Sequence, residues 1–90
     1  MNANVLGSSL IAGVPHVTCE LKLSKETRLA GQSIGKIESD EKLRVLARTP
    51  SAGKADHSPQ SADVVQAGDT LVVHLPSERL SRLSASIGAR

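Results

Sequence analysis

Two arginine side chains in one short segment are the residues of this chain best suited to bind a phosphate group. Arg44 and Arg48 lie in the stretch 43–48, where every second residue is apolar. Residues spaced by two or four along a strand point to the same side, so we expect both arginines on one face. Two guanidinium groups on one face can hold a phosphate through paired hydrogen bonds. The alternative is a solvent-facing strand edge with two ordinary arginines.

The segment after these arginines adds two candidate ligand residues. His57 and Pro59 lie in the stretch 50–62, which holds two prolines, one glycine and several serines. This composition predicts a loop with room for a short edge strand, and binding residues are often carried on loops. The alternative for His57 is a solvated loop histidine. The candidate ligand-binding residues are therefore Arg44, Arg48, His57 and Pro59.

No metal-binding or catalytic arrangement is expected. The three histidines, at positions 16, 57 and 74, have no recognised metal-ligand spacing. His74 lies in an apolar strand, and we expect a core or interface residue whose ring nitrogens are satisfied. Cys19 falls on the apolar side of another strand and is expected to act as a small buried hydrophobe. The serines form no nucleophile motif, and no carboxylate pair stands out, so we predict that the chain is not an enzyme.

Length and composition narrow the classes of protein to consider. With 90 residues, the chain makes one small domain, and self-association is a natural way for such a domain to bury more surface. A net charge of +2 and the absence of aromatic residues count against a nucleic acid polymer as partner. No apolar run approaches the ~20 residues of a membrane span. A single cysteine fits a reducing, cytoplasmic setting.

The apolar pattern predicts strands and helices in a definite order. Alternation predicts strands at 16–23, 43–48 and 70–75 and a short strand at 63–66. The spacing of Ile34 and Ile37 predicts a short helix over 33–39. A final helix is expected after Pro76, with Ser77 as its cap and an inward stripe made of Leu80, Leu83 and Ile87. Residues 1–15 are expected to form a short helix ended by Pro15, and 85–90 a C-terminal tail.

Two glycine turns connect these elements. Gly31 and Gly68 can take positive φ without steric cost, and Asp69 can hydrogen-bond the backbone as the chain turns. The stretch 64–75 reads as a strand, a tight reversal on Gly68 and Asp69, and a second strand. The predicted fold class is α+β, a small sheet of about four strands in β-α-β-β-β-α order with two short helices.

The two turns, taken with this order of elements, resemble the TrkA-C domain, also called the RCK C-terminal domain. The first motif is Leu29–Ile37 (LAGQSIGKI) and the second is Gln66–Val73 (QAGDTLVV). The arginine-bearing strand, the loop proline Pro59 and the closing helix fit the same family pattern. Gln32 departs from it where a lysine is common, and Lys36 where a glutamate is common. The resemblance covers residues 17–84 and defines a domain at 16–84, with 1–15 as a linker or residual N-terminal connection.

The resemblance implies a function. Such domains regulate potassium or other cation channels and transporters at the inner face of the membrane, form homodimers, and in some members bind cyclic di-AMP or another small anionic ligand at the dimer interface. It also implies that the chain is a C-terminal piece of a longer protein, because no glycine-rich nucleotide-binding fingerprint follows a strand. Partners would be a second copy and a membrane channel or transporter subunit. Two alternatives stay open at this point: a ligand-free structural dimerisation module, and a lipoyl- or cupin-like β module, whose domains also contain AGD hairpins.

Overall fold

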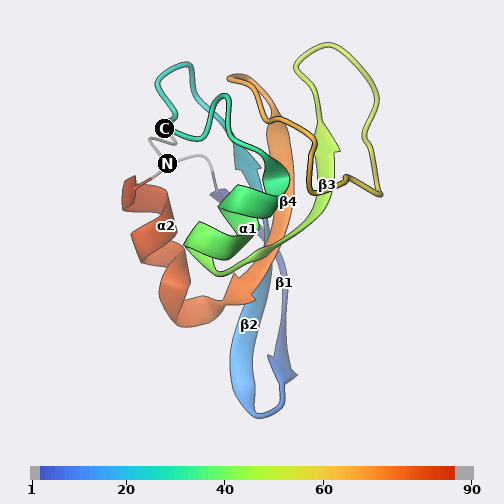
Figure 1. Ribbon diagram of the computed structural model, residues 1–90. Helices are drawn as coiled ribbons and strands as arrows, with labels where there is room; N and C mark the ends of the chain where they lie inside the picture. The colour runs from blue at the N-terminus through green and yellow to red at the C-terminus, as the bar shows by residue number, and fades with distance from the viewer. Residues whose placement is uncertain (1–2, 87–90) are drawn as a thin grey trace.

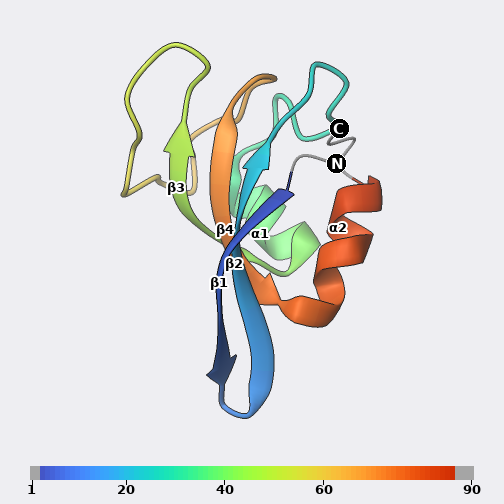
Figure 2. The ribbon, with the colours of Figure 1, turned by 180° about the vertical axis from the view of Figure 1, so that it is seen from behind.

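A single antiparallel sheet organises the chain. The computed structural model describes residues 3–86, in which four strands pair in the order β1-β2-β4-β3. The elements run along the chain as β1 Ala3–Ile11, β2 Val14–Lys22, α1 Ile34–Glu41, β3 Arg44–Thr49, β4 Thr70–Pro76, the short helix η1 Ser77–Arg79 and α2 Leu80–Ser86. Both α-helices lie on one face of the sheet, in front of it in Figure 1 and behind it in Figure 2. The α+β prediction with about four strands and two short helices is confirmed.

The core lies between the sheet and the two helices. Alternate residues of the two central strands point toward the helices and are buried, as the period-two pattern predicts, and Ile34 and Ile37 of α1 and Leu83 of α2 face them. Cys19 is fully buried among these residues, as expected for a small hydrophobe. The buried strand residues are Val17, Cys19 and Leu21 of β2 and Leu71, Val73 and Leu75 of β4.

The N-terminal segment is a strand, so the helix predicted for residues 1–15 is wrong. β1 pairs with β2 from Ala3↔Leu21 to Ile11↔Val14. The connection is a two-residue turn in which Ala12 and Gly13 have φ of 50° and 81°, the signs that a type I′ hairpin requires. An irregularity between Val5 and Gly7 leaves Leu6 as an extra residue, which broke the alternation in the sequence. Whether residues 1–15 connect to a preceding domain stays a prediction.

The predicted hairpin over 64–75 is also wrong in its first half. Val64 makes only an isolated bridge, to Ser33. The Val65 backbone bonds to the first glycine turn, with Gly31 N–H donating to the Val65 carbonyl at 2.8 Å and Val65 N–H to the Gln32 carbonyl at 2.9 Å. The fourth strand of the sheet is therefore β1 rather than 63–66, and the observed order is β-β-α-β-β-α.

The two glycine turns have the predicted conformation. Gly31 and Gly68 both have φ of 86°, which a residue with a Cβ adopts only at a steric cost. The Gly68 turn closes onto the end of β2, because Gly68 N–H donates to the Leu23 carbonyl at 3.1 Å and Leu23 N–H to the Asp69 carbonyl at 2.9 Å. The turns thus hold the loops at one end of the sheet to each other.

The helices match their predicted positions, with one correction at a cap. α1 begins after Ser33, whose hydroxyl accepts a hydrogen bond from Lys36 N–H. The final helix begins as η1, and Ser77 lies inside it rather than capping it; Pro76 precedes it without a side-chain cap. Leu80 packs partly buried against the core, whereas Ile87 lies outside the described residues. No helix in the described part of the chain is long and apolar enough to cross a membrane.

Candidate functional site

A bulge in β3 separates the two candidate arginines. Arg44 pairs with His74 and Arg48 pairs with Leu71, with a register shift between Val45 and Ala47. Directly paired residues share a face, and residues three apart on a strand lie on opposite faces, so Arg44 and Arg48 point to different sides of the sheet. The prediction that they share one face is wrong, because the inserted residue inverts the alternation.

Arg48 is engaged inside the protein. Its Nε donates to Asp69 Oδ2 at 2.8 Å, and the same carboxylate oxygen accepts from Gln66 N–H at 2.9 Å. The Asp69 side chain is 3% exposed. A buried carboxylate needs such partners because an uncompensated charge in the interior is costly. Asp69 therefore anchors its turn to β3, which goes beyond the turn role predicted for it.

The two loop candidates lie at the other end of β3 from Arg44. The loop bridges to this strand where Arg48 and Asp56 exchange backbone hydrogen bonds of 2.9 and 2.8 Å. His57 follows this bridge and is exposed, and Pro59 is half-buried. The structure thus places Arg48, His57 and Pro59 near one end of β3 and Arg44 at the other. A ligand role for these four residues stays a prediction.

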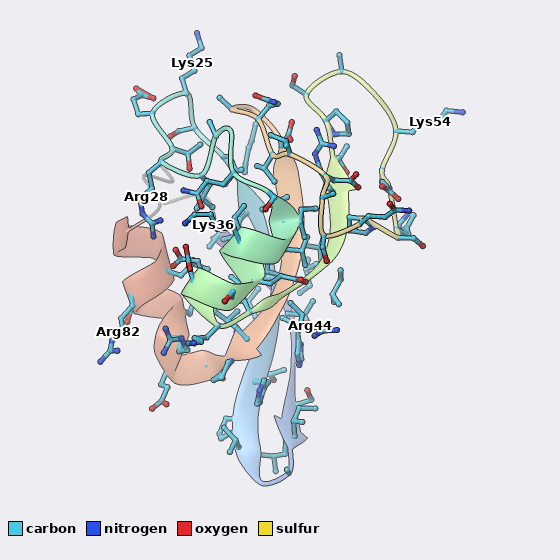
Figure 3. All side chains as sticks on the ribbon, in the orientation of Figure 1. Lys25, Arg28, Lys36, Arg44, Lys54 and Arg82 are labelled. Atoms are coloured by element: carbon cyan, nitrogen blue, oxygen red, sulfur yellow. The ribbon has the colours of Figure 1, made fainter. Side chains whose placement is uncertain are left out.

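Arg44 lines an open pocket of about 540 Å³. The pocket is lined by residues of α1 and by the start of β3, the start of β2 and the end of β4. Small-molecule sites typically occupy 300–1,000 Å³, so the volume suits a ligand of nucleotide size. Figure 3 shows Arg44 extending from the β3 side of the molecule, away from Lys25, Arg28 and Lys36. The lining residues that carry charge or imidazole groups are His16, Glu38, Lys42, Arg44 and His74.

Two histidines stack in this pocket. The rings of His16 and His74 are 5.2 Å apart between centroids and inclined by 16°. His16 Nδ1 lies 2.9 Å from the Val14 carbonyl, and a carbonyl only accepts, so this nitrogen carries a proton and donates. His74 Nδ1 lies 2.9 Å from Thr18 Oγ1. One nitrogen of each ring is thereby occupied, which orients both rings. The prediction that the ring nitrogens of His74 have hydrogen-bond partners is confirmed for Nδ1. The residue is half-buried and does not belong to the core.

The charge balance of the pocket favours an anion. Lys42 and Arg44 are exposed and bring two permanent positive charges. The single carboxylate of the lining, Glu38, accepts a hydrogen bond from Val45 N–H at 2.9 Å through Oε2, which ties it to the protein backbone. Because the chain has no aromatic residue, the planar groups able to stack on a ligand ring here are the Arg44 guanidinium and the two imidazoles.

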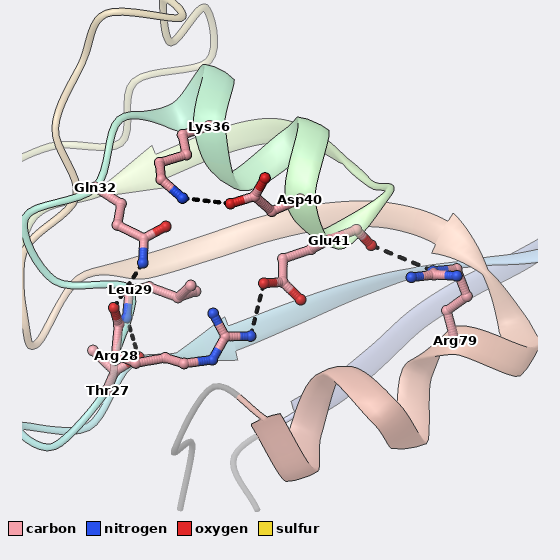
Figure 4. Close-up of polar contacts among 8 residues, drawn as sticks. All are labelled: Thr27, Arg28, Leu29, Gln32, Lys36, Asp40, Glu41 and Arg79. Carbon is pink, nitrogen blue, oxygen red and sulfur yellow. Dashed lines mark hydrogen bonds and ion pairs between the residues drawn. The ribbon is translucent and has the colours of Figure 1, made fainter.

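Polar contacts hold α1 in place beside the pocket (Figure 4). Arg28 and Glu41 form an ion pair at 2.7 Å that ties the loop before α1 to its last residue. Arg79 Nε donates to the Glu41 carbonyl at 3.4 Å, which links α1 to η1. Near the start of the helix, Lys36 pairs with Asp40. The Lys36 ammonium lowers the pKa of the Asp40 carboxyl from its ordinary value.

The loop 61–63 covers the N-terminal end of α1. Ile34 N–H donates to the Asp63 carbonyl at 2.8 Å and Gly35 N–H to the Ser61 carbonyl at 2.9 Å. A Cβ at Gly35 would lie 3.1 Å from the Ser61 Cβ, so glycine permits this close approach. The free amides of a helix start are commonly an anion site, but here the protein itself occupies them.

Sequence reasoning found Arg44 but missed its neighbours. Lys42 follows the end of α1, whereas His16 lies in β2 and His74 in β4. Only the β2 to β4 register, with His16 opposite Pro76 and Thr18 opposite His74, brings the histidines together. One signal for this pair was present in the sequence: in both strands the histidine alternates with buried apolar residues, so both side chains point away from the core. In the described residues, no group of three His, Cys, Asp or Glu side chains is placed to hold a metal ion.

Comparisons with known proteins bear on the fold. No protein-family model and no curated protein matches the chain. Among solved structures, the RCK_C domain dimer of S. agalactiae BusR in complex with c-di-AMP matches with a TM-score of 0.64 and 22% identity, over 74% of this chain and 84% of that one. The GsuK RCK domain matches with a TM-score of 0.67 and 24% identity, over 98% of this chain and 19% of that one. The chain has the RCK C-terminal fold.

The RCK C-terminal fold confirms the expected resemblance at the level of architecture. The lipoyl- or cupin-like alternative is wrong, because the described strands form one open sheet with helices on one face. S. agalactiae BusR in complex with its busAB-promotor DNA also matches, with a TM-score of 0.64 and 22% identity, over 74% of this chain and 33% of that one. BusR, a protein that contains this fold, therefore binds DNA. This match counts against the prediction that a nucleic acid polymer is not a partner.

Proposed function

We propose that the chain is a non-catalytic regulatory domain that self-associates and binds a small anionic ligand in the pocket at Arg44. The observation that carries the proposal is the convergence of Arg44, Lys42 and the His16–His74 stack on a pocket of about 540 Å³. Two fixed cations suit phosphate oxygens, and the two stacked imidazole rings offer planar surfaces beside them. The RCK_C domain of BusR was solved as a dimer with c-di-AMP, which supports the ligand class and the self-association.

The wider setting is part of the same proposal. The domain would lie in the cytoplasm and regulate a potassium or other cation channel or transporter through a membrane subunit. A ligand controls such an assembly only when it binds one arrangement better than the other. Support for this setting comes from the RCK C-terminal fold and from the matching GsuK RCK domain.

Titration calorimetry tests the ligand part. Cyclic di-AMP, ATP and inorganic phosphate are titrated into the chain and into Arg44→Gln. We expect one of the nucleotides to bind and R44Q to weaken it by about tenfold or more, because a charge-assisted hydrogen bond contributes about 1.5–3 kcal/mol. Arg82→Gln, which removes the same charge from the exposed face of α2, is the matched control and should leave affinity unchanged.

The ligand-free dimerisation module is the second candidate. It is favoured by the exposed apolar residues of β1, among them Leu6 at 53% and Leu10 at 72% exposure, which can mediate self-association without a ligand. No heat with any of the three compounds, together with a dimer in solution, would select this candidate over the first.

A further inference from the structure

The two edge strands of the sheet, β1 and β3, differ in how well they are protected against pairing with a strand of another molecule. β3 carries two arginines and a bulge and is bridged by the following loop at Asp56, all of which block pairing with another strand. β1 forms the opposite edge, spans nine residues and has no charged side chain. The β1–β2 hairpin projects beyond the body of the molecule in both ribbon views (Figures 1 and 2). A long, uncharged, exposed edge strand is a template for pairing.

The sequence of β1 is complementary to itself when read in reverse. The stretch Val5–Ile11 is VLGSSLI, and about Ser8 each apolar residue has an apolar counterpart and each small residue a small one. In an antiparallel pair centred on Ser8, Leu6 lies opposite Leu10 of the second strand and Gly7 opposite Ser9. A two-fold interface requires this kind of self-complementary surface.

We propose that β1 pairs with β1 of a second copy of this chain, antiparallel about a two-fold axis at Ser8, to form one continuous eight-stranded sheet. The ladder runs over Leu6–Leu10, since the bulge at Leu6 interrupts the regular alternation beyond it. Cross-strand contacts between the two leucines, which are now 53% and 72% exposed, would cover apolar surface on both copies. This deepens the self-association named in the proposed function and rests on that part alone.

The first test measures the oligomeric state of the full chain by sedimentation equilibrium. The wild type is expected at twice the 9.4 kDa chain mass, and Leu10→Lys is expected to weaken the dimer at least tenfold, because a lysine opposite the partner's Leu6 must lose its hydration. Val64→Lys is the matched control, since Val64 is an exposed apolar residue at 41% outside β1. Circular dichroism checks that both variants stay folded.

The second test fixes the register. Residues directly opposite have Cβ atoms about 4.5–5.5 Å apart, and diagonal residues about 7–8 Å. Ser8→Cys should therefore form an intermolecular disulfide under mild oxidation, whereas Ser9→Cys, one residue away, should do so much more slowly. The native Cys19 is fully buried and should not cross-link.

The outcomes separate this pairing from the rest of the proposed function. A monomer up to the solubility limit overturns both the pairing and self-association. A dimer that L10K leaves intact, or one in which Ser8→Cys and Ser9→Cys cross-link equally, overturns the β1 pairing while self-association stands. Loss of the dimer in L10K but not V64K, with fast cross-linking only at position 8, supports the pairing whatever the calorimetry shows.

Discussion

At the scale of single residues, the Asp69 carboxylate forms a buried ion pair with Arg48, at the end of β3 away from the pocket. The sequence predicts a turn former at position 69, whereas the structure shows a buried carboxylate that accepts hydrogen bonds from Arg48 Nε and Gln66 N–H. The ion pair therefore fixes the Gly68 turn to β3 across 21 residues of sequence. Arg48, which the sequence presented as a ligand-binding residue, has its Nε occupied by this structural contact.

Removing Arg48 should cost stability. In Arg48→Met the Asp69 carboxylate stays buried without its cation, and breaking a buried pair in this way costs about 3–5 kcal/mol; we expect about 3, because Arg48 is 20% exposed. Since the chain has no aromatic residue, urea unfolding is followed by far-ultraviolet circular dichroism. Arg44→Met, at an exposed position on the same strand, should cost less than about 0.5 kcal/mol. Equal losses in the two variants would contradict the assignment.

At the scale of elements, the first glycine turn joins two segments that the sequence suggested only as separate features. Gly31 and Gln32 bond to both backbone groups of Val65, and Val65 is fully buried. The loop between β3 and β4 is thereby fixed to the entrance of α1, where Ser61 and Asp63 accept the first helix amides. This connection holds α1, and with it the wall of the pocket, against the sheet.

Substitution of Gly31 should separate backbone strain from loss of space. A Cβ at Gly31 meets nothing within 4 Å, so Gly31→Ala is disfavoured by its φ of 86° alone, at about 1–2 kcal/mol. Gly31→Asn should lose less, because asparagine tolerates the left-handed region. Urea midpoints of both variants measure the difference. If alanine is as stable as asparagine or glycine, backbone strain does not select glycine here.

At the scale of the whole molecule, the described residues form one sheet that packs a single hydrophobic core against the helices. Cys19 lies fully buried on β2, between β1 and β4. Burial raises the pKa of its thiol, which reduces the reactive thiolate further. Its reactivity therefore reports opening of the central sheet.

Thiol labelling should follow global unfolding. Under native conditions we expect Cys19 to react with a disulfide reagent slower than in urea by on the order of 10³ or more, because buried groups react through rare opening. Arg48→Met should raise the labelling rate of Cys19 by the same factor by which it raises the equilibrium constant for unfolding. Arg44→Met should leave the rate unchanged. A fast native reaction that is insensitive to R48M would instead indicate local opening of β2.

The sequence by itself determined the elements whose signals are local. These local signals are the alternation in β2 and β4, the spacing of Ile34 and Ile37 in α1, and the positive φ of Gly31 and Gly68. For β3 the sequence predicted the strand itself but not the bulge that breaks its alternation. Together these elements indicated the RCK C-terminal fold. The strand at 3–11 was not predicted, because the extra residue at Leu6 breaks the alternation of apolar residues. Its turn is also Ala12-Gly13 rather than Asn-Gly, which is the stronger hairpin signal.

Only the tertiary structure decided which segments meet. Val65 pairs with Gly31 and Gln32 instead of β4, the bulge in β3 sends Arg44 and Arg48 to opposite faces, and the strand register stacks His16 on His74. Each of these depends on hydrogen bonds between residues far apart in the chain, and a shift of one residue in a strand moves every following side chain to the other face. The candidate site could therefore be predicted from the sequence at Arg44, while its remaining residues were set by pairing and register.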